Sequence, residues 1–205
     1  MKLSKAISGI IVIFLLSTFY GCGYNTLVSL DEQVNQAWAQ VENQYQRRMD
    51  LIPNLVKTVE GVADFEKSVM TEVTNARSRV GQITLKPEDL ADAEKFAEYQ
   101  KAQDQLGSAL SRLLVVSENY PQLKSNENFL QLQSQLEGTE NRIAVERKKF
   151  NEAVQSYNTN TRTFPKIIIA KIFGFKEKEY FKAKEGSDKA PDVNFDFNKK
   201  SEEKK

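Results

Sequence analysis

The first long stretch of the chain carries apolar residues at spacings of three and four, which is the pattern of an amphipathic helix. This apolar stripe is sustained over about seven heptads. Charged residues interrupt it at Arg48 and Glu66. Its members are Leu27, Leu30, Val34, Ala37, Val41, Tyr45, Ile52, Leu55, Val59, Val62, Val69, Val73, Ala76 and Val80. The pattern predicts one long helix.

Pro53 lies inside this stripe, and a proline removes one helical hydrogen bond and clashes with the preceding turn. The stripe keeps its register through Ile52 and Leu55, and Ile52 would be a poor N-cap for a new helix. We therefore favour a kinked, continuous helix. A break at Pro53 is the alternative.

Two further helices follow the first. Pro87, with acidic residues after it, is well placed near the N-terminus of the second helix, and Pro121 closes that helix. Ser125 or Asn126 can cap the third helix, whose apolar spacing continues until Pro165.

No segment shows the period-two alternation of a strand, so the predicted fold is all-α. The expected architecture is an antiparallel bundle of three long helices with short connections and an N-terminal membrane anchor. A four-helix bundle broken at Pro53 is the alternative.

The predicted helices differ in length. The first spans about 80 Å from Leu27 to Val80, whereas the second, from Glu88 to Tyr120, spans about 50 Å. Part of the first helix would then lack a partner within the chain. The candidate partner-binding residues on this part are Leu30, Val34, Trp38 and Val41. If the helix instead breaks at Pro53 and folds back, the same chain covers them.

The N-terminus resembles an export signal. Lys2 and Lys5 precede an uncharged, mostly apolar run, Ala6 to Tyr20, which is short for a bilayer span. Cys22 follows at the place where a bacterial lipoprotein signal is cut and its cysteine lipidated. Tyr20 departs from that pattern, so a retained transmembrane anchor and simple secretion stay open. Residues 1–21 are thus a signal or anchor segment.

The C-terminal region differs from the bundle. Residues 166–175 are mostly apolar, and they predict a short helix or turn that caps the bundle, or a patch that contacts a membrane or a partner. Residues 184–205 are rich in charged and polar residues and predict a solvated, disordered tail. The helical bundle is accordingly assigned to residues 22–183.

The amino-acid composition argues against several classes of function. Twenty-nine Lys and Arg against twenty-eight Asp and Glu give a net charge of +1, which argues against a nucleic-acid binder. The absence of His removes the commonest general base and metal ligand. One Cys cannot form an internal disulfide or a thiolate metal cluster. We expect no cofactor and no metal.

Individual candidate sites are weak. Arg47 and Asp50 are expected to pair at i and i+3 on a solvated helix. Glu140, Asn141 and Arg142 are expected to make interhelical hydrogen bonds that fix helix register. Serines are present, but no G-x-S-x-G elbow and no histidine accompany them, which excludes a hydrolase triad.

Buried charge is a further expectation. Glu66 and Glu146 both fall on apolar stripes, and Lys101 comes to a similar height on the second helix. Two carboxylates facing one seam repel each other unless a cation or polar groups intervene. The sequence therefore predicts a polar layer centred on Lys101 or filled with water.

Four separated blocks resemble the signature of the LemA family. They are Cys22 to Asn25; Gln44 to Val56; Gly138 to Ala144 with Tyr157-Asn158 and Phe164-Pro165; and Phe173 to Phe175. The resemblance implies a bacterial, membrane-anchored, all-helical protein whose bulk lies outside the cytoplasm, with no agreed activity and no catalytic residues. The family-motif residues, expected to be structural, are Arg47, Arg48, Asp50, Pro53, Asn54, Glu140, Asn141, Arg142, Asn158 and Pro165.

We therefore expect a non-enzymatic envelope protein, held at a membrane by its N-terminus, that presents a helical bundle to another envelope protein. The alternative is a self-assembling scaffold that uses the exposed apolar seam of the first helix. An enzyme with a carboxylate site is a remote alternative.

Overall fold

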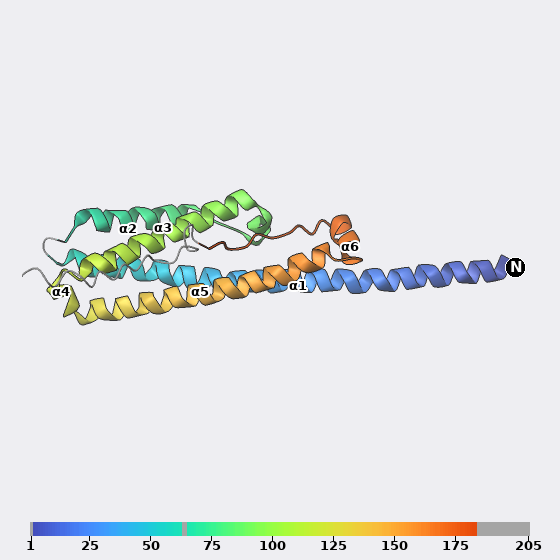
Figure 1. Ribbon diagram of the computed structural model, residues 1–205, viewed down its shortest axis with the longest axis horizontal. Coiled ribbons are helices and arrows are strands. Elements are labelled where there is room, and N and C mark those ends of the chain that lie inside the picture. Colours follow the sequence, from blue (N-terminus) through green and yellow to red (C-terminus); the bar gives the residue numbers. More distant parts are fainter. Residues whose placement is uncertain (1, 63–64, 184–205) are drawn as a thin grey trace, which may run out of the picture.

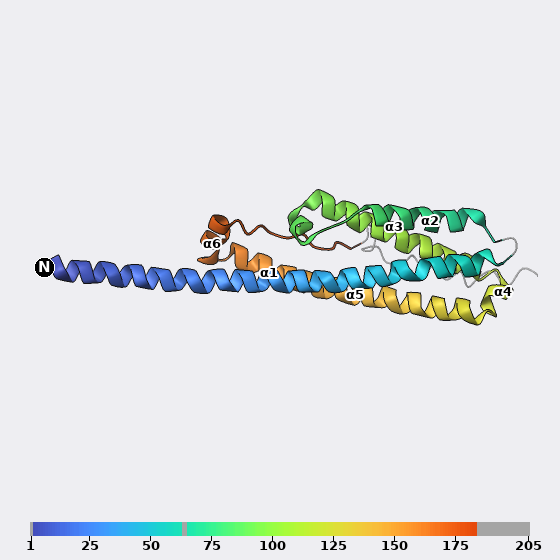
Figure 2. The same ribbon diagram turned by 180° about the vertical axis from the view of Figure 1, so that it is seen from behind.

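The computed structural model describes residues 2–62 and 65–183, with side chains from residue 23 onward. The elements, in chain order, are α1 (Lys2–Glu60), α2 (Lys67–Gln82), the 3₁₀ helix η1 (Pro87–Ala91), α3 (Ala93–Ser117), α4 (Pro121–Lys124), α5 (Glu127–Arg162) and α6 (Lys166–Phe173). No strand occurs among these residues. The prediction of an all-α bundle is confirmed (Figures 1 and 2).

The first helix ends earlier than predicted. α1 passes through Pro53 without a break, as favoured, but it stops at Glu60, and α2 begins at Lys67. α2 then turns back beside α3, so four long helices, α1, α2, α3 and α5, alternate in direction (Figure 1). Gly61 is a poor helix former, and Phe65 is buried in the turn against Tyr120. The break therefore lies at residues 61–66 and not at Pro53.

Helix ends follow the expected capping chemistry. Asn126 is the N-cap of α5, and its Oδ1 accepts from the Phe129 N–H at 3.1 Å. Asp92 caps α3 by accepting from the amides of Glu94 and Lys95. Pro87 starts the 3₁₀ helix that precedes α3. Gly174 ends α6 with a φ of 77°, a conformation that favours glycine.

The core has two main parts. One lies toward α4 and contains the apolar residues of α2, most of α3 and the second half of α1. The other is aromatic and surrounds Trp38, whose ring centroid lies 5.6 Å from those of Tyr99 and Phe150. Phe181 stacks on Trp38 at 6.1 Å. Phe181, distant in sequence, thus completes the core around the middle of α1.

The predicted exposed seam on the first helix is wrong. Val34 and Val41 have no exposed surface, Trp38 is 1% exposed, and Leu30 is half-buried against the same cluster. α5 runs along α1 as far as α6, and residues 175–183, called the C-terminal strap below, cover the remainder (Figure 2). The prediction failed because α5, with 36 residues, is longer than α3, with 25, and packs along the part of α1 that α3 does not reach.

The predicted N-terminal anchor is not tested by the structure. Among the described residues, no helix has a stretch long and apolar enough to cross a bilayer. The Cys22 side chain and residues 184–205 lie outside the described part of the chain, so lipidation and the solvated tail stay predictions.

Candidate functional site

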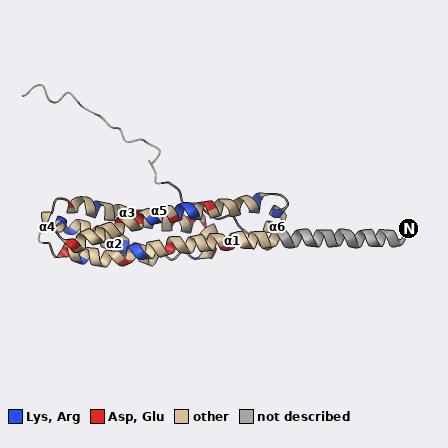
Figure 3. Cartoon of the chain, turned by 90° about the horizontal axis from the view of Figure 1, so that it is seen from below, with Lys and Arg blue, Asp and Glu red and all other residues tan. Residues whose placement is uncertain are grey.

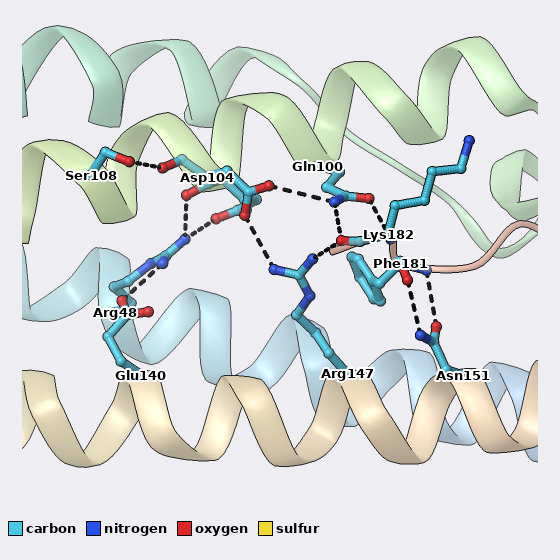
Figure 4. Close-up of polar contacts among 10 residues, drawn as sticks. Arg48, Gln100, Asp104, Ser108, Glu140, Arg147, Asn151, Phe181 and Lys182 are labelled. Atoms are coloured by element: carbon cyan, nitrogen blue, oxygen red, sulfur yellow. Dashed lines mark hydrogen bonds and ion pairs between the residues drawn. The ribbon is translucent and has the colours of Figure 1, made fainter. Parts of the chain in front are cut away.

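A buried arginine joins three helices at the middle of the bundle. Arg48 on α1 is 2% exposed, and its Nη1 donates to Glu140 Oε1 on α5 at 2.8 Å. Its Nη2 donates to the backbone carbonyl of Gln103 on α3 at 3.2 Å and to the side-chain oxygen of Gln103 (Figure 4). Gln103 is itself buried. The polar layer that was expected around Lys101 is therefore built on Arg48.

A second arginine lies next to this layer and reaches the strap. Arg147 on α5 pairs with Asp104 on α3 at 3.2 Å, and its guanidinium lies over the Phe181 ring at 4.4 Å from the centroid. Its Nη2 also donates to the Lys182 carbonyl at 3.4 Å. Two arginines and two carboxylates thus balance their charges between the helices, as Figure 4 shows.

Two tyrosines border the arginine layer. The rings of Tyr45 and Tyr99 are 5.8 Å apart, and the Arg48 guanidinium lies 5.2 Å from the Tyr45 ring centroid. Burial raises the pKa of Tyr45 to about 12, and burial also raises the pKa of Tyr99. The Tyr45 hydroxyl is buried and has no hydrogen-bond partner among the described residues. Both tyrosines are therefore neutral at pH 7.

Side-chain amides hold the strap by its backbone. Asn158 donates to the Lys178 carbonyl at 2.8 Å and accepts from the Lys178 amide at 2.9 Å. Asn151 makes the same pair of bonds to Phe181, at 3.0 and 2.9 Å. Gln100 on α3 does so to Lys182, at 2.8 and 3.2 Å. These contacts imitate strand pairing and fix an extended segment between α3 and α5.

A charged contact fixes the strap at its other end. Lys178 is 8% exposed, and its Nζ pairs with Asp31 on α1 at 2.8 Å and donates to Asn35 at 3.2 Å. The same ammonium lies 5.5 Å from the Tyr157 ring centroid. The strap thereby ties α1 to α5.

The family-motif residues separate into two groups. Arg48, Glu140 and Asn158 make the contacts described above, whereas Asn141 and Arg142 are exposed on α5 and have no interhelical hydrogen bond among the described residues. Pro165 follows a cis peptide bond and precedes α6.

The expected Arg47–Asp50 pair is absent among the described contacts. Arg47 donates to Gln135 on α5 at 3.0 Å, and Asp50 accepts from Gln46 at 2.7 Å. Asn54 is exposed, and its carbonyl accepts from the Thr58 hydroxyl. Arg47 thus links two helices.

The predicted polar layer centred on Lys101 does not contain the residues that were expected in it. Glu66 is exposed at the start of α2, and Lys101 is exposed on α3. Glu146 pairs with Lys149 on its own helix at 2.8 Å. The predicted heights along the bundle axis were counted along one continuous helix through residue 80. Because α1 ends at Glu60 and α2 starts at Lys67, those heights are wrong for every later residue.

Asn151 and Gln100 were missed by the sequence analysis. Asn151 lies one residue after the buried Phe150 and seven residues before Asn158, so both amides occupy the same side of α5. Two amides on one helical face beside an apolar stripe are the signal that could have identified a backbone-binding groove.

The described surface has two hollows near the strap. The larger, of about 1210 Å³, lies between α2 and α3 and is lined by Glu72, Asn75, Arg79, Lys101 and Asp104, among others, with Lys182 and Ala183 at its edge. The smaller, of about 660 Å³, lies between α5 and the strap. Among the described residues, no three His, Cys, Asp or Glu come together as a metal site.

All of these features except Asp31 and Asn35 lie within one family match. A sequence model of the LemA family matches residues 37–195, which include the arginine layer, α6 and the strap. The chain belongs to the LemA family. The predicted resemblance to this family is thereby confirmed, and three of the four sequence blocks, all except Cys22 to Asn25, lie within the matched residues.

Curated relatives of this LemA-family chain carry two names. The chain is 30% identical over 181 residues to the magnetosome protein MamQ 2 of Paramagnetospirillum magneticum, covering 80% of this chain and 66% of that relative. It is 28% identical over 204 residues to the magnetosome protein MamQ of Magnetospirillum gryphiswaldense, covering 92% and 75%. It is 22% identical over 161 residues to protein LemA of Metamycoplasma hominis, covering 78% and 69%.

Proposed function

We propose that this LemA-family chain is a non-enzymatic envelope protein, attached to a membrane through its N-terminal segment, whose bundle binds another protein outside the cytoplasm. The observation that carries the proposal is the continuity of α1, which joins the uncharged run Ala6 to Tyr20 to the core of the bundle. Family membership also supports a membrane or envelope location.

Two kinds of attachment fit this proposal. If residues 1–21 are removed, a lipidated Cys22 begins the mature chain, and several acyl chains hold it stably. If they are retained, the uncharged run itself enters the membrane. Cys22→Ala distinguishes the two, because it releases the chain or blocks processing only in the first case. Mass spectrometry of the membrane-bound N-terminus gives the answer.

The non-enzymatic role is supported by the chemistry of the arginine layer. Asp104 and Glu140, the carboxylates at its centre, are each engaged by a guanidinium. Tyr45 and Tyr99 keep their protons, because burial raises the pKa of each hydroxyl. The layer holds helices and strap together, which is a structural task.

The hollow between α2 and α3 is the surface we assign to the partner. It carries charges of both signs, Glu72 and Asp104 with Arg79 and Lys101, and it is open to solvent. Basic and acidic residues are interspersed along the helices of the bundle (Figure 3), so a partner would be recognised by shape and paired charges.

A photo-crosslinking amino acid at Asn75, in this hollow, tests the proposal in intact cells. The matched control is Gln131, which is also exposed, on α5, but lies outside the hollow. A crosslink to one unlike protein at Asn75 and none at Gln131 supports the proposal. Products at whole multiples of the chain mass would instead indicate self-assembly, and equal labelling at both positions would overturn the assignment of the hollow.

A further inference from the structure

Exposed apolar side chains gather at one end of the bundle. Phe164 is 77% exposed, Ile172 65%, Phe173 58%, Ile168 43% and Tyr24 38%; these five residues form the α6 patch. The other large apolar side chains exposed in the described chain, Val115, Leu130, Val145 and Tyr180, lie on α3, α5 and the strap. Exposed apolar clusters of this kind mark contact surfaces.

The patch is held rigidly on α1. The inner face of α6, Ile169 and Ala170, is buried against Leu27. Gly23 allows this contact, because a Cβ at that position would lie 2.5 Å from Ile169 Cδ1. The Tyr24 ring lies 4.8 Å from that of Phe173. α6 thus caps the bundle with one face and leaves Ile168 and Ile172, one turn apart, on the other.

The location of α6 points to its partner. Figures 1 and 3 show α6 at the point where α1 leaves the bundle toward the N-terminus. The uncharged run ends at Tyr20, three residues before Gly23, which is about 5 Å along a helix. Cys22, the alternative attachment, is the neighbour of Gly23. Either attachment brings a lipid surface to within one helical turn of α6.

The chain segment that carries most of the patch is basic, and Arg162 at its start pairs with Glu177, just beyond its end, at 3.8 Å. Residues 162–176 include Arg162, Lys166, Lys171 and Lys176, and they contain no Asp or Glu. Basic residues beside an exposed apolar helical face are typical of helices that lie in a membrane interface, where anionic headgroups attract them.

We propose that α6 is an interfacial foot. Its outer face enters the boundary between headgroups and acyl chains of the membrane that holds the N-terminus, and Lys166, Lys171 and Lys176 lie at the level of anionic phosphates. This inference rests on the membrane attachment proposed above. The foot would set the tilt of the bundle, which the N-terminal attachment alone leaves free.

Depth-dependent quenching in vesicles tests the foot. The full chain is reconstituted into phosphatidylcholine–phosphatidylglycerol vesicles that contain a lipid spin-labelled near the glycerol. Ile172→Trp reports on α6, and Val115→Trp on α3 is the matched control, because both side chains are 65% exposed. Trp38, the natural tryptophan, is buried and gives the same background in both variants. We expect at least threefold stronger quenching at position 172.

The outcomes separate the foot from the attachment. Vesicle flotation measures attachment first: a chain that does not float overturns the proposed function and the foot together. A chain that floats, with equal quenching of the two tryptophans, overturns the foot alone and leaves its apolar face to a protein partner. Lys171→Glu combined with Lys176→Glu should reduce quenching at position 172 at least twofold, whereas Lys148→Glu on α5 should not; no difference between them would overturn the role given to the lysines.

Discussion

Arg48 fixes the relative axial positions of three helices. Its guanidinium has one partner on α5, the part-exposed Glu140, and another on α3, the buried Gln103. A slip of either helix by one turn, about 5.4 Å, would leave a buried charge without its partners, which is strongly unfavourable. The arginine therefore selects one register among several that the apolar stripes alone would allow.

Arg48→Met should lower the free energy of unfolding by about 1–3 kcal/mol. The cost arises mainly at Gln103, which is buried and would lose its partner, while the part-exposed Glu140 can return to water. Thermal or urea unfolding of the full chain in detergent measures the loss.

Arg47→Met is the control for that experiment. Arg47 is adjacent in sequence but exposed, so its replacement should change stability by no more than about 0.5 kcal/mol. Equal effects at the two positions would contradict the assignment of a register-setting role to Arg48.

Tyr45 should make stability depend on alkaline pH. Its pKa is raised to about 12 in the folded chain, from 10.0, so the folded state holds this proton more tightly. The stabilisation is complete below pH 10 and is lost as the pH rises from 10 to 12, about 1 kcal/mol of it by pH 11.

Tyr45→Phe removes that pH dependence. It also removes a buried hydroxyl without a partner, so the variant should equal or exceed the natural chain at pH 7, by up to about 1 kcal/mol. Urea unfolding at pH 7 and pH 11 should show the difference growing in favour of Phe. A difference that stays constant between the two pH values would refute the prediction.

Residue-level prediction succeeded where the register was correct. Arg48 stood at a stripe position, and it is buried there. Glu66 also stood at a stripe position, yet it is exposed, because a turn separates it from the helix on which it was counted. The hydrogen-bond partners of Arg48 are Gln103 and Glu140. They depend on how segments distant in sequence pack together, and the apolar pattern of a single helix does not contain that information.

At the level of elements, α1 tolerates Pro53 because another helix supplies a donor. Pro53 has no N–H, so the Met49 carbonyl four residues earlier lacks its helical partner. Arg77 on α2 donates its Nε to that carbonyl at 3.5 Å. The carbonyl that lacks its hydrogen bond within α1 thereby forms a contact between α1 and α2.

A double-mutant cycle should reveal this compensation. Arg77→Met should destabilise the natural chain by about 1 kcal/mol, and less in a Pro53→Ala background, where the backbone N–H of the introduced alanine satisfies the Met49 carbonyl. The comparison uses the free energies of unfolding of all four chains. Additive effects of the two substitutions would show that Arg77 acts elsewhere.

The strap should loosen when its amide clamp is removed. Asn158→Ala deletes both bonds to the Lys178 backbone and leaves the buried Lys178 carbonyl and amide without partners, a loss of about 1–3 kcal/mol in strap docking. Trypsin should then cleave after Lys178 several-fold faster.

Asn141→Ala provides the comparison for the strap experiment, since Asn141 is exposed on the same helix. Cleavage after Lys178 should be unchanged there. The same rate in the Asn158 and Asn141 variants would mean that the ion pair with Asp31 holds the strap without help from the amide.

Element prediction failed at the first turn for a physical reason. Apolar spacing of three and four continues across residues 61–66, because the end of α1 and the start of α2 face the same core. Gly61 was the local sign of a stop. The strap, which has no periodicity, could not be read from a pattern at all, although the amides that bind it lie on a regular helix.

The described part of the molecule is a slender rod, with α1 along its full length (Figure 2). The part of α1 within the bundle, from Gly23 to Glu60, corresponds to about 57 Å at 1.5 Å per residue. If α6 rests on the membrane, the α4 turn lies at the far end of the rod.

Neutron reflectometry on a supported bilayer should therefore find a protein layer about 55–60 Å thick. The full chain, with its attachment intact, is the sample. Ile168→Glu combined with Ile172→Glu should thin the layer, because the foot would no longer hold the rod upright. A layer of about 25–30 Å for the natural chain would show that the bundle lies flat.

The continuity of α1 also fixes the rotational orientation of the bundle about the axis of this helix. Each residue of an α-helix turns the chain by about 100°, so every face of residues 2–22 has one set direction relative to the hollow between α2 and α3. If residues 1–21 are retained in the membrane, one residue inserted after Tyr20 would rotate the bundle by about 100° about the membrane normal, and seven inserted residues would nearly restore its original direction. Two copies of the chain that contact each other within the membrane would therefore have their hollows in relative orientations set by the rotation per residue of α1.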